Sequence, residues 1–428
     1  MRRLLFIFSF LSLLVVDGKA QEVETLTLED CLRIGIDNNL SLEGKRKEIQ
    51  KSKYGVSENR SKLLPQITVI AGYNNNFDPP VSVTDGSSYG VPYNITKTLQ
   101  HTANAGLEMQ MPLFNQTLYT SMSIAKVMEE ISRLSYGKAR EDIIMQISKM
   151  YYLGQVTAEQ IVLIKANITR LEELRDITQA FFDNGMSMEV DLKRVNINLE
   201  NLKVQYDNAQ AMMKQQLNML KYIMDYPAEK EFVLTPVNTD SITTVALTGL
   251  SENIYELQLS QSQVQLAEKQ KKIISNGYIP SLSLTGSWRY AAYTDKGYHW
   301  FHSGPSNHWF RSYGLGLTLR IPIFDGLDKT YKIKKAMIDI ENSKLAWENA
   351  RKSLQTQYLN AVNDLMNNQR NFKKQKDNYL LAEDVYTVTS DRYREGIASM
   401  TEVLQDEMQM SEAQNNYISA HYNYRITN

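Results

Sequence analysis

The residues with the clearest capacity for metal chemistry are the five histidines of the chain. His299, His302 and His308 stand among tryptophans and phenylalanines, between two predicted strands. Imidazole groups at this spacing can bind a transition metal, but no carboxylate or thiol completes a ligand set there. The other two, His101 and His421, are isolated in the sequence. We therefore expect an aromatic surface loop and no metal site.

Other groups that could carry out catalysis are equally sparse. Cys31 is the only cysteine, so no disulfide holds the chain together, and we expect it to fill a small buried position in a helix. No nucleotide-binding glycine loop follows a predicted strand, and no nucleophile elbow or paired-cysteine zinc motif is present. The formal net charge of -1 provides no basic surface for nucleic acid. The sequence predicts a protein that is not an enzyme, takes no cofactor and binds no nucleic acid.

Two glycines followed by acidic residues are the strongest candidates for a functional site. We expect long helices to end at Gly185 and Gly396, because glycine adopts the left-handed conformation at no steric cost. The acidic residues that follow are Glu189, Asp191, Glu402 and Asp406. Near a helix start such carboxylates can simply complement the helix dipole. Alternatively, they form a ring of negative charge around a pore mouth, which the symmetry of an oligomer would multiply.

These glycines belong to a tandem duplication of the whole chain. Three landmarks recur in the same order, at offsets of 215, 210 and 211 residues. They are residues 62–69 and 277–284, residues 109–115 and 319–325, and residues 182–185 and 393–396. Each copy reads as helix, strand, loop, strand, very long helix, sharp turn and helix. The architecture is therefore predicted to be internally duplicated.

The predicted strands alternate between apolar and polar residues, which indicates half-buried strands. They form two hairpins, over residues 66–111 and 281–321, joined by long loops that we interpret as external. Alternation alone would also fit an ordinary sheet with one wet face. A lipid-facing barrel is favoured by strand length and by aromatic residues near the strand ends. These aromatics are Tyr73, Trp288, Tyr290, Tyr293 and Tyr313.

Four strands are too few to close a transmembrane barrel, since membrane barrels begin at about eight strands. Open strand edges would leave backbone groups without hydrogen bonds in lipid. If these strands span a membrane, the chain must therefore oligomerise through them. Counting strands allows a dimer or a trimer and does not choose between them.

Two stretches of 68 residues without proline, 115–182 and 327–394, predict helices roughly 100 Å long. In the second stretch, apolar residues recur at a strict spacing of seven, which is typical of a coiled-coil seam. They are Tyr358, Leu365, Phe372, Tyr379, Tyr386 and Tyr393, with Ile340, Trp347, Leu354 and Ala361 in the intermediate register. We interpret this stripe as a packed helix interface and not as the lining of a binding channel. A hollow helical tube and a solid two-helix rod both fit the polar residues outside the seam.

The first twenty residues have the pattern of a cleavable secretory signal: two arginines, an apolar run and small residues before Gln21. We predict a signal peptide over residues 1–20 and a first structural repeat over residues 21–230. A linker over residues 231–250 and a second repeat over residues 251–428 complete the chain. No later stretch approaches the length of apolar sequence that a spanning helix requires.

Taken together, these motifs resemble the TolC-type outer membrane efflux proteins. The resemblance covers residues 24–425. It rests on residues 26–30 and 38–39, and on the Leu-Pro-Gln and Ile-Pro-Ser strand starts. The Met-Pro-Leu-Phe and Ile-Pro-Ile-Phe-Asp-Gly junctions and the glycine turns before residues 190–192 and 402–404 complete it.

The resemblance implies an α+β membrane protein in the outer membrane, with a long periplasmic extension. A long α-helical coiled-coil barrel would continue a transmembrane β-barrel built from four strands per protomer. The family implies a homotrimer that acts as a passive exit duct in efflux or type I secretion. Its partners would be outer-membrane lipid, a periplasmic adaptor (membrane fusion) protein, and an inner-membrane RND, ABC or similar transporter.

The chain departs from the family pattern at the predicted tip. Ala398 stands where an arginine often follows the second glycine, and Gln405 stands at a position where the family often has aspartate. The usual tip salt bridge is therefore not expected in its usual composition. The rival to an exit duct is a secreted coiled-coil structural or adhesive protein without a pore.

Overall fold

The computed structural model describes most of the chain. The described residues are 24–97, 99–236, 249, 251, 253–294 and 308–427. The predicted signal peptide and much of the predicted linker lie outside them. Among these residues, no helix has both the length and the apolarity needed to cross a membrane.

The chain divides into two compact units. The first comprises residues 1–40, 140–247 and 359–428, and the second comprises residues 41–139 and 248–358. Both units draw on both halves of the sequence.

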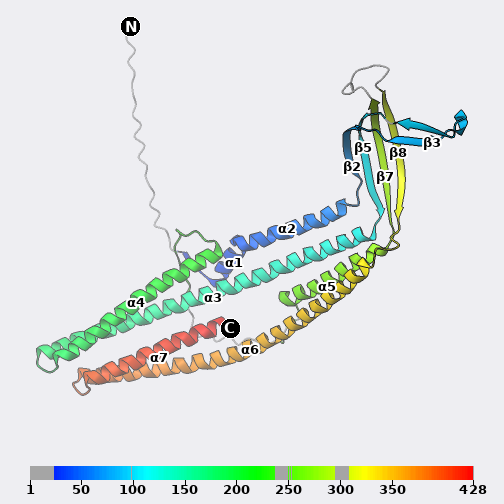
Figure 1. Ribbon diagram of the computed structural model, residues 1–428. Helices are drawn as coiled ribbons and strands as arrows, with labels where there is room; N and C mark the ends of the chain where they lie inside the picture. The colour runs from blue at the N-terminus through cyan, green and yellow to red at the C-terminus, as the bar shows by residue number, and fades with distance from the viewer. Residues whose placement is uncertain are drawn as a thin grey trace, which may run out of the picture. The chain divides into compact units, whose positions relative to one another are not determined.

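Four long helices dominate the first unit (Figure 1). Helix α3 (Gln116–Asp183) runs into this unit and is followed by α4 (Glu189–Met224). Helix α6 (Asp328–Arg394) is followed in the same way by α7 (Met400–Thr427). Helices α3 and α6 contain 68 and 67 residues, which confirms the prediction of two very long helices.

The spacing of seven in α6 corresponds to a packed aromatic seam. Phe372 stacks on Tyr417 and Tyr424 of α7, with ring centroids 5.9 and 5.2 Å apart. The seam residues from Phe372 to Tyr393 are buried, which confirms that this stripe is a helix interface. The earlier residues of the stripe are unevenly buried: Leu354 is buried, Leu365 is half-buried and Ala361 is exposed.

The seam ends where its partner helix ends. Asn368 Nδ2 of α6 donates to Thr427 Oγ1, in the last residue of α7, at 3.4 Å. Residues of α6 that precede this level have no part of α7 to pack against. Heptad spacing alone does not show where the partner helix stops.

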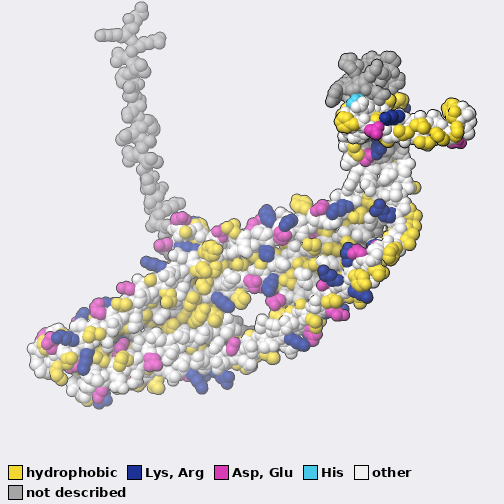
Figure 2. Space-filling view, in the orientation of Figure 1, with side chains coloured by type: hydrophobic (Ala, Val, Ile, Leu, Met, Phe, Trp, Pro, Cys, Tyr) yellow, Lys and Arg dark blue, Asp and Glu magenta, His cyan; other side chains and the backbone are white. Residues whose placement is uncertain are grey.

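The core of the first unit combines all four helices. Leu171 and Leu174 of α3 and Val195, Leu199 and Leu202 of α4 pack in one cluster with the α6–α7 seam. The outward surfaces carry both signs of charge, dispersed along the helices (Figure 2). The sequence copies thus contribute jointly to one apolar core.

A second, smaller core surrounds the start of the described chain. Strand β1 (Glu24–Leu26) pairs in parallel with β6 (Phe232–Leu234). Both strands were missed by the sequence reading, because three residues carry no measurable periodicity. Cys31 lies in this core on α1 (Leu28–Asn38), fully buried as expected.

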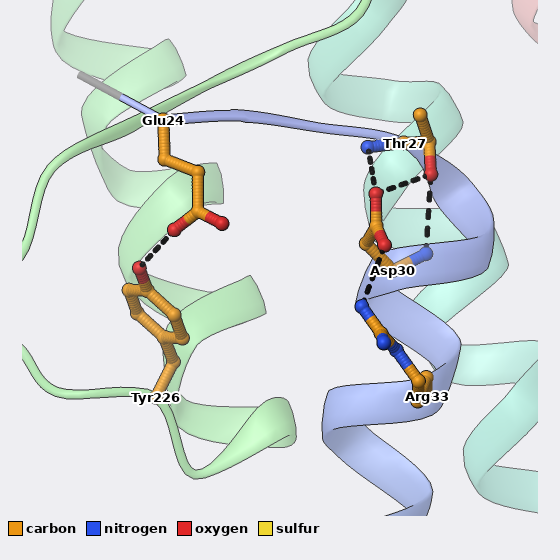
Figure 3. A network of polar contacts seen from close by, with 5 residues as sticks. All are labelled: Glu24, Thr27, Asp30, Arg33 and Tyr226. Carbon is orange, nitrogen blue, oxygen red and sulfur yellow. Dashed lines mark hydrogen bonds and ion pairs between the residues drawn. The ribbon is translucent and has the colours of Figure 1, made fainter. Parts of the chain in front are cut away.

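Polar contacts stabilise this start, mostly within the first turns of α1 (Figure 3). Thr27 and Asp30 form a capping box: Asp30 N donates to Thr27 Oγ1 at 3.2 Å, and Thr27 N donates to Asp30 Oδ2 at 3.3 Å. Arg33 donates to the other oxygen of Asp30 at 2.8 Å. Nearby, the Tyr226 hydroxyl donates to Glu24 at 3.4 Å. Such a cap satisfies amide groups at the helix start that have no partner within the helix.

The second unit places two shorter helices beside the beginnings of α3 and α6. They are α2 (Leu40–Ser61) and α5 (Tyr255–Ser275). Lys138 of α3 pairs with Glu256 of α5 at 2.8 Å. Gly137 allows the Tyr255 ring to approach, because a Cβ at this glycine would lie 2.4 Å from a ring carbon.

The sheet of the second unit contains four antiparallel strands (Figure 1). They are β2 (Gln66–Asn75), β5 (His101–Phe114), β7 (Ser281–Thr294) and β8 (His308–Arg320). Their order in the sheet is β2-β5-β7-β8. Within the described residues the sheet is open, with β2 and β8 as its edges.

The connection between β2 and β5 corrects one prediction. It was expected to be a long loop, but it contains the hairpin β3 (Val81–Asp85) and β4 (Tyr93–Lys97), closed by the 3₁₀ turn η1 (Ser87–Tyr89). Apolar side chains cover this hairpin in Figure 2. Its strands are five residues each, too short to stand out among the glycines and serines that surround them.

Candidate functional site

The four strands present one continuous apolar face. Their register aligns Ile67, Met109, Gly286 and Leu315 at one level, and Val69, Leu107, Trp288 and Tyr313 at the next. Leu315 is 79% exposed and Val69 is 77% exposed. The alternation predicted for each strand separately therefore coincides across all four. An exposed apolar face of this kind marks a surface that contacts a membrane or another protein.

Aromatic residues gather at one end of this face, where the β2–β5 and β7–β8 connections leave the sheet. Tyr73, Trp288, Tyr290 and Tyr313 occupy neighbouring levels, and Trp309 joins them at the level of Tyr73. Trp288 and Tyr290 are in edge contact, with ring centroids 5.7 Å apart. The sequence reading did not include Trp309, although its position in the alternation could have identified it.

Tyr293 does not belong to this aromatic group. It lies one residue out of step with Trp288 and Tyr290, so strand alternation points it to the opposite face. There its ring lies beside Phe310, with centroids 6.2 Å apart. The prediction grouped it by its nearness to the strand end and did not apply the alternation.

The opposite face of the sheet is polar and contains an ion pair. Arg289 of β7 donates to the carboxylate of Glu108 on β5. A groove on this face is lined by these two residues and by Gln66, Thr68, Gly314 and Gly316, among others. A sheet with one apolar and one wet face is what a wall between lipid and water requires.

Both predicted tip glycines adopt the left-handed conformation, with φ of +74° at Gly185 and +75° at Gly396. Gly185 N donates to Phe182 O at 2.9 Å, and Met186 N donates to Phe181 O at 2.8 Å. The turn at Gly396 repeats this pattern of hydrogen bonds. The two copies therefore end their long helices by the same device, a Schellman motif.

The acidic residues after the first turn have basic partners on their own helix. Glu189 pairs with Lys193 at 2.8 Å, and Asp191 pairs with Arg194 at 3.3 Å. The hydrogen bond from Lys193 holds the pKa of Glu189 below its usual value. Both carboxylates stand in the first turn of α4, where they also complement the helix dipole.

The acidic residues after the second turn differ from each other. Glu402 Oε2 accepts from Ser399 N at 3.0 Å, and Ser399 Oγ accepts from Glu402 N at 3.3 Å, which makes a capping box for α7. Asp406 is half-buried, and no ion pair to it occurs among the residues that the structure describes. Ala398 is buried beside this start, and Gln405 is exposed.

A buried polar network was missed by the sequence reading. Glu159 of α3 accepts from the Tyr417 hydroxyl at 2.7 Å and lies 2.8 Å from Nδ1 of His421. Arg425 Nε donates to His421 Nε2 at 3.2 Å, so Nε2 accepts and Nδ1 carries the proton given to Glu159. Burial raises the pKa of Glu159, but these hydrogen bonds and the Arg425 charge outweigh burial and lower it overall.

Two further polar links join α3 to α6 and to α7. Arg170 of α3 pairs with Glu383 of α6 at 2.9 Å, and Asn167 donates to Gln414 of α7 at 2.6 Å. No spacing rule would have found either network, since the partners lie more than two hundred residues apart.

The described part of the chain contains no group of three or more residues that could hold a metal ion. His299 and His302 lie outside the described residues. His308 begins β8. His101 lies on β5, with Nδ1 2.8 Å from the Tyr73 hydroxyl.

A comparison with known protein families identifies one to which this chain is similar in sequence. A sequence model described as outer membrane efflux protein matches residues 34–224 and 239–428. The chain belongs to the outer membrane efflux protein family. It is therefore a protein of the outer membrane with a role as an efflux channel. Each matched segment contains one very long helix and one pair of sheet strands.

Individual members of the family are distant in sequence. The outer membrane protein TolC of Vibrio cholerae is 21% identical over 385 residues, which cover 87% of this chain and 82% of that protein. TolC of Salmonella enteritidis is 20% identical over 386 residues, covering 87% of this chain and 74% of that protein. These relatives confirm the TolC-type resemblance.

Solved structures share the fold of this efflux protein. CusC superposes with a TM-score of 0.76 at 16% identity, covering 94% of this chain and 90% of that one. The outer membrane protein VceC of Vibrio cholerae has a TM-score of 0.70 at 14% identity and covers 94% of both chains. At such identities the likeness concerns the fold alone.

Proposed function

We propose that this chain is the subunit of a homotrimeric exit duct, in which twelve strands from three copies close one barrel in the outer membrane. The observation that carries the proposal is the open sheet, apolar on one face and polar on the other. In lipid, the unpaired backbone groups of β2 and β8 would each cost several kcal/mol. Pairing β8 of one copy with β2 of the next removes both edges at once.

Strand direction supports this closure. Neighbouring strands are antiparallel throughout the sheet, so β8 runs opposite to β2 and can pair with a neighbour's β2 in the same manner. Eight or twelve strands would both make a barrel. We adopt three copies because the TolC-type resemblance implies a trimer.

The polar face would then line the water-filled interior, and the long helices would continue the duct through the periplasm. We further propose that the duct is passive and not an enzyme. It would offer a wet passage, and we identify no catalytic group among the residues that the structure describes. Energy would come from an inner-membrane RND, ABC or similar transporter, coupled through a periplasmic adaptor protein. The Glu189, Asp191, Glu402 and Asp406 carboxylates at the two helix turns would form its gate.

Mass and cross-linking test the trimer. Detergent-extracted protein should have three times the chain mass. In a Cys31→Ala background, Thr68→Cys on β2 would be combined with Gly314→Cys, Gly316→Cys or Thr318→Cys on β8. Within one chain these positions lie three strand spacings apart, about 14 Å, which is too far for a disulfide. A covalent ladder ending at three copies is expected, and Thr68→Cys alone should give none.

A water-soluble single chain with both hairpins folded would overturn the duct. Such a result would favour the secreted coiled-coil protein without a pore. The substrate class needs a separate experiment: deletion of the gene, followed by comparison of drug susceptibility with the secreted proteins. Increased susceptibility would indicate efflux of small molecules, and loss of a secreted protein would indicate type I secretion.

A further inference from the structure

One charged residue interrupts the apolar face of the sheet. Arg311 lies on β8 directly opposite Tyr290 of β7, in step with the apolar residues of both strands. Among the described residues of the four strands, no other Asp, Glu, Lys or Arg lies on this face. The remaining arginines of these two strands, Arg289 and Arg320, belong to the polar face.

Aromatic side chains surround Arg311. Its guanidinium carbon lies 5.9 Å from the centre of the Tyr313 ring, a cation–π contact. Trp309 lies two residues earlier on the same face of β8, and Tyr290 is the cross-strand neighbour. A ring beneath the guanidinium plane leaves its N–H groups free to donate to another ligand.

Arg311 has no anionic partner in the part of the chain that is described. Arg289, on the other face, is paired with Glu108. Among the described residues of the four strands, no carboxylate lies on the apolar face, so the sheet itself supplies no counter-charge and Arg311 can take one from outside the chain. The side chain is exposed and accessible to such a group.

The position of Arg311 along its strand indicates the chemical class of the anion that would pair with it. The levels beyond it, toward the helices, carry Leu315, Leu317 and Leu319, an apolar stretch suited to hydrocarbon. Arginine is unfavourable at hydrocarbon depth but tolerated at the interface, where tyrosine and tryptophan gather. In the proposed membrane placement, Arg311 would stand at the depth of lipid headgroups, in which phosphate is the anionic group.

We propose that Arg311, held by Tyr313, binds the phosphate of an anionic membrane lipid at the outer boundary of the apolar band. The inference rests on the proposed membrane placement of the sheet. The guanidinium fork matches two phosphate oxygens, which makes arginine better suited than lysine to this ligand. In a trimer the site would occur three times around the wall.

Tryptophan quenching in vesicles tests the site, since Trp288 and Trp309 lie on the same face as Arg311. Full-length protein would be reconstituted in phosphatidylcholine vesicles containing brominated phosphatidylglycerol or brominated phosphatidylcholine. Wild type should bind the anionic lipid about fivefold more strongly than the zwitterionic one. Arg311→Gln should lose this preference, and Arg311→Lys should retain part of it.

Arg320→Gln is the matched control, because it removes an arginine from the same strand on the opposite face. It should keep the wild-type preference. If Arg311→Gln retains the preference, or wild type has none, the lipid site is wrong. If inorganic phosphate at the headgroup concentration displaces the lipid, the ligand is free phosphate and the lipid assignment is overturned. If neither brominated lipid quenches either protein, the membrane placement itself fails, and the proposed duct with it.

Discussion

Arg289 of β7 donates to Glu108 of β5, and the pair joins the two central strands of the sheet. The strands come from different copies of the duplication, so this contact connects the copies on the polar face. Glu108 stands directly opposite Ser287, and Arg289 stands opposite Gly106. Arg289 passes across Gly106, where a Cβ would lie only 2.9 Å from its Cγ. The same Cβ would lie 2.4 Å from the backbone oxygen of Trp288, so the glycine permits the close approach of the two strands that carry the ion pair.

This pair should balance the charge of the duct interior. We expect Glu108→Gln to leave an unpaired arginine and shift ion selectivity toward anions, because rings of one charge favour the opposite ion. Arg289→Gln should shift it toward cations. Reversal potentials of single channels in a salt gradient would measure both effects. Ser287→Ala, a neighbouring uncharged change, should alter neither, and a shift of the same sign in both charge variants would contradict the assignment.

The Glu159 network should make stability depend on pH. The pKa of Glu159 is lower in the folded protein than its ordinary value of 4.5. The stabilisation is therefore complete above that ordinary value and is lost as pH falls through the folded pKa. Glu159→Gln should lower the free energy of unfolding by about 2 kcal/mol at pH 7. The difference in the free energy of unfolding between wild type and Glu159→Gln should become smaller below about pH 4.

Chemical unfolding in detergent at both pH values would measure this dependence. Glu200→Gln is a suitable control, because Glu200 is exposed and, within the described part of the chain, its one ion pair is with Lys203 at 3.0 Å. It should change stability by less than about 0.5 kcal/mol. An equal loss of unfolding free energy in Glu159→Gln and Glu200→Gln would show that the buried Glu159 network contributes nothing to stability.

The turn glycines should be costly to replace for a purely conformational reason. Nothing lies within 4 Å of a Cβ built at Gly185 or Gly396, yet each has a positive φ. Alanine at either position should therefore cost about 1–2 kcal/mol from the left-handed backbone alone. Thermal unfolding would measure the loss.

Gly44 provides the opposite case within the same chain. It lies inside helix α2, also with open space around its Cβ. Gly44→Ala should raise stability by roughly 0.5–1 kcal/mol, because glycine is a poor helix former. If all three alanine variants change stability alike, the left-handed conformation is not what requires glycine at the turns.

Substitutions of the carboxylates that follow the two turn glycines distinguish a role in gating from a role in helix capping. If these carboxylates close a pore mouth, Asp191→Ala and Glu402→Ala should raise the resting conductance in planar bilayers. Ser399→Ala removes the capping partner of Glu402 but keeps its charge, at a cost of about 1 kcal/mol in stability. It should leave conductance unchanged. Equal effects of Ser399→Ala and Glu402→Ala on conductance would instead identify Glu402 as a cap.

Local features of this protein could be predicted because they depend on neighbouring residues. Period-two alternation determines which face each strand residue occupies, and it would have corrected Tyr293 had it been applied there. The absence of proline from 116 to 183 permits one uninterrupted helix, and Gly185 ends it. Each of these properties depends on a few adjacent peptide units and their side chains.

The tertiary structure decided the contacts between distant residues. Sheet register placed Arg289 against Glu108 and aligned four apolar faces into one, whereas a shift of one residue would have separated them. Packing brought Glu159 to His421, and it ended the aromatic seam of α6 where α7 ends. The β1–β6 pair depends on partners more than two hundred residues apart. Such contacts are stabilised by burial and by long-range pairing, which no local spacing in the sequence records.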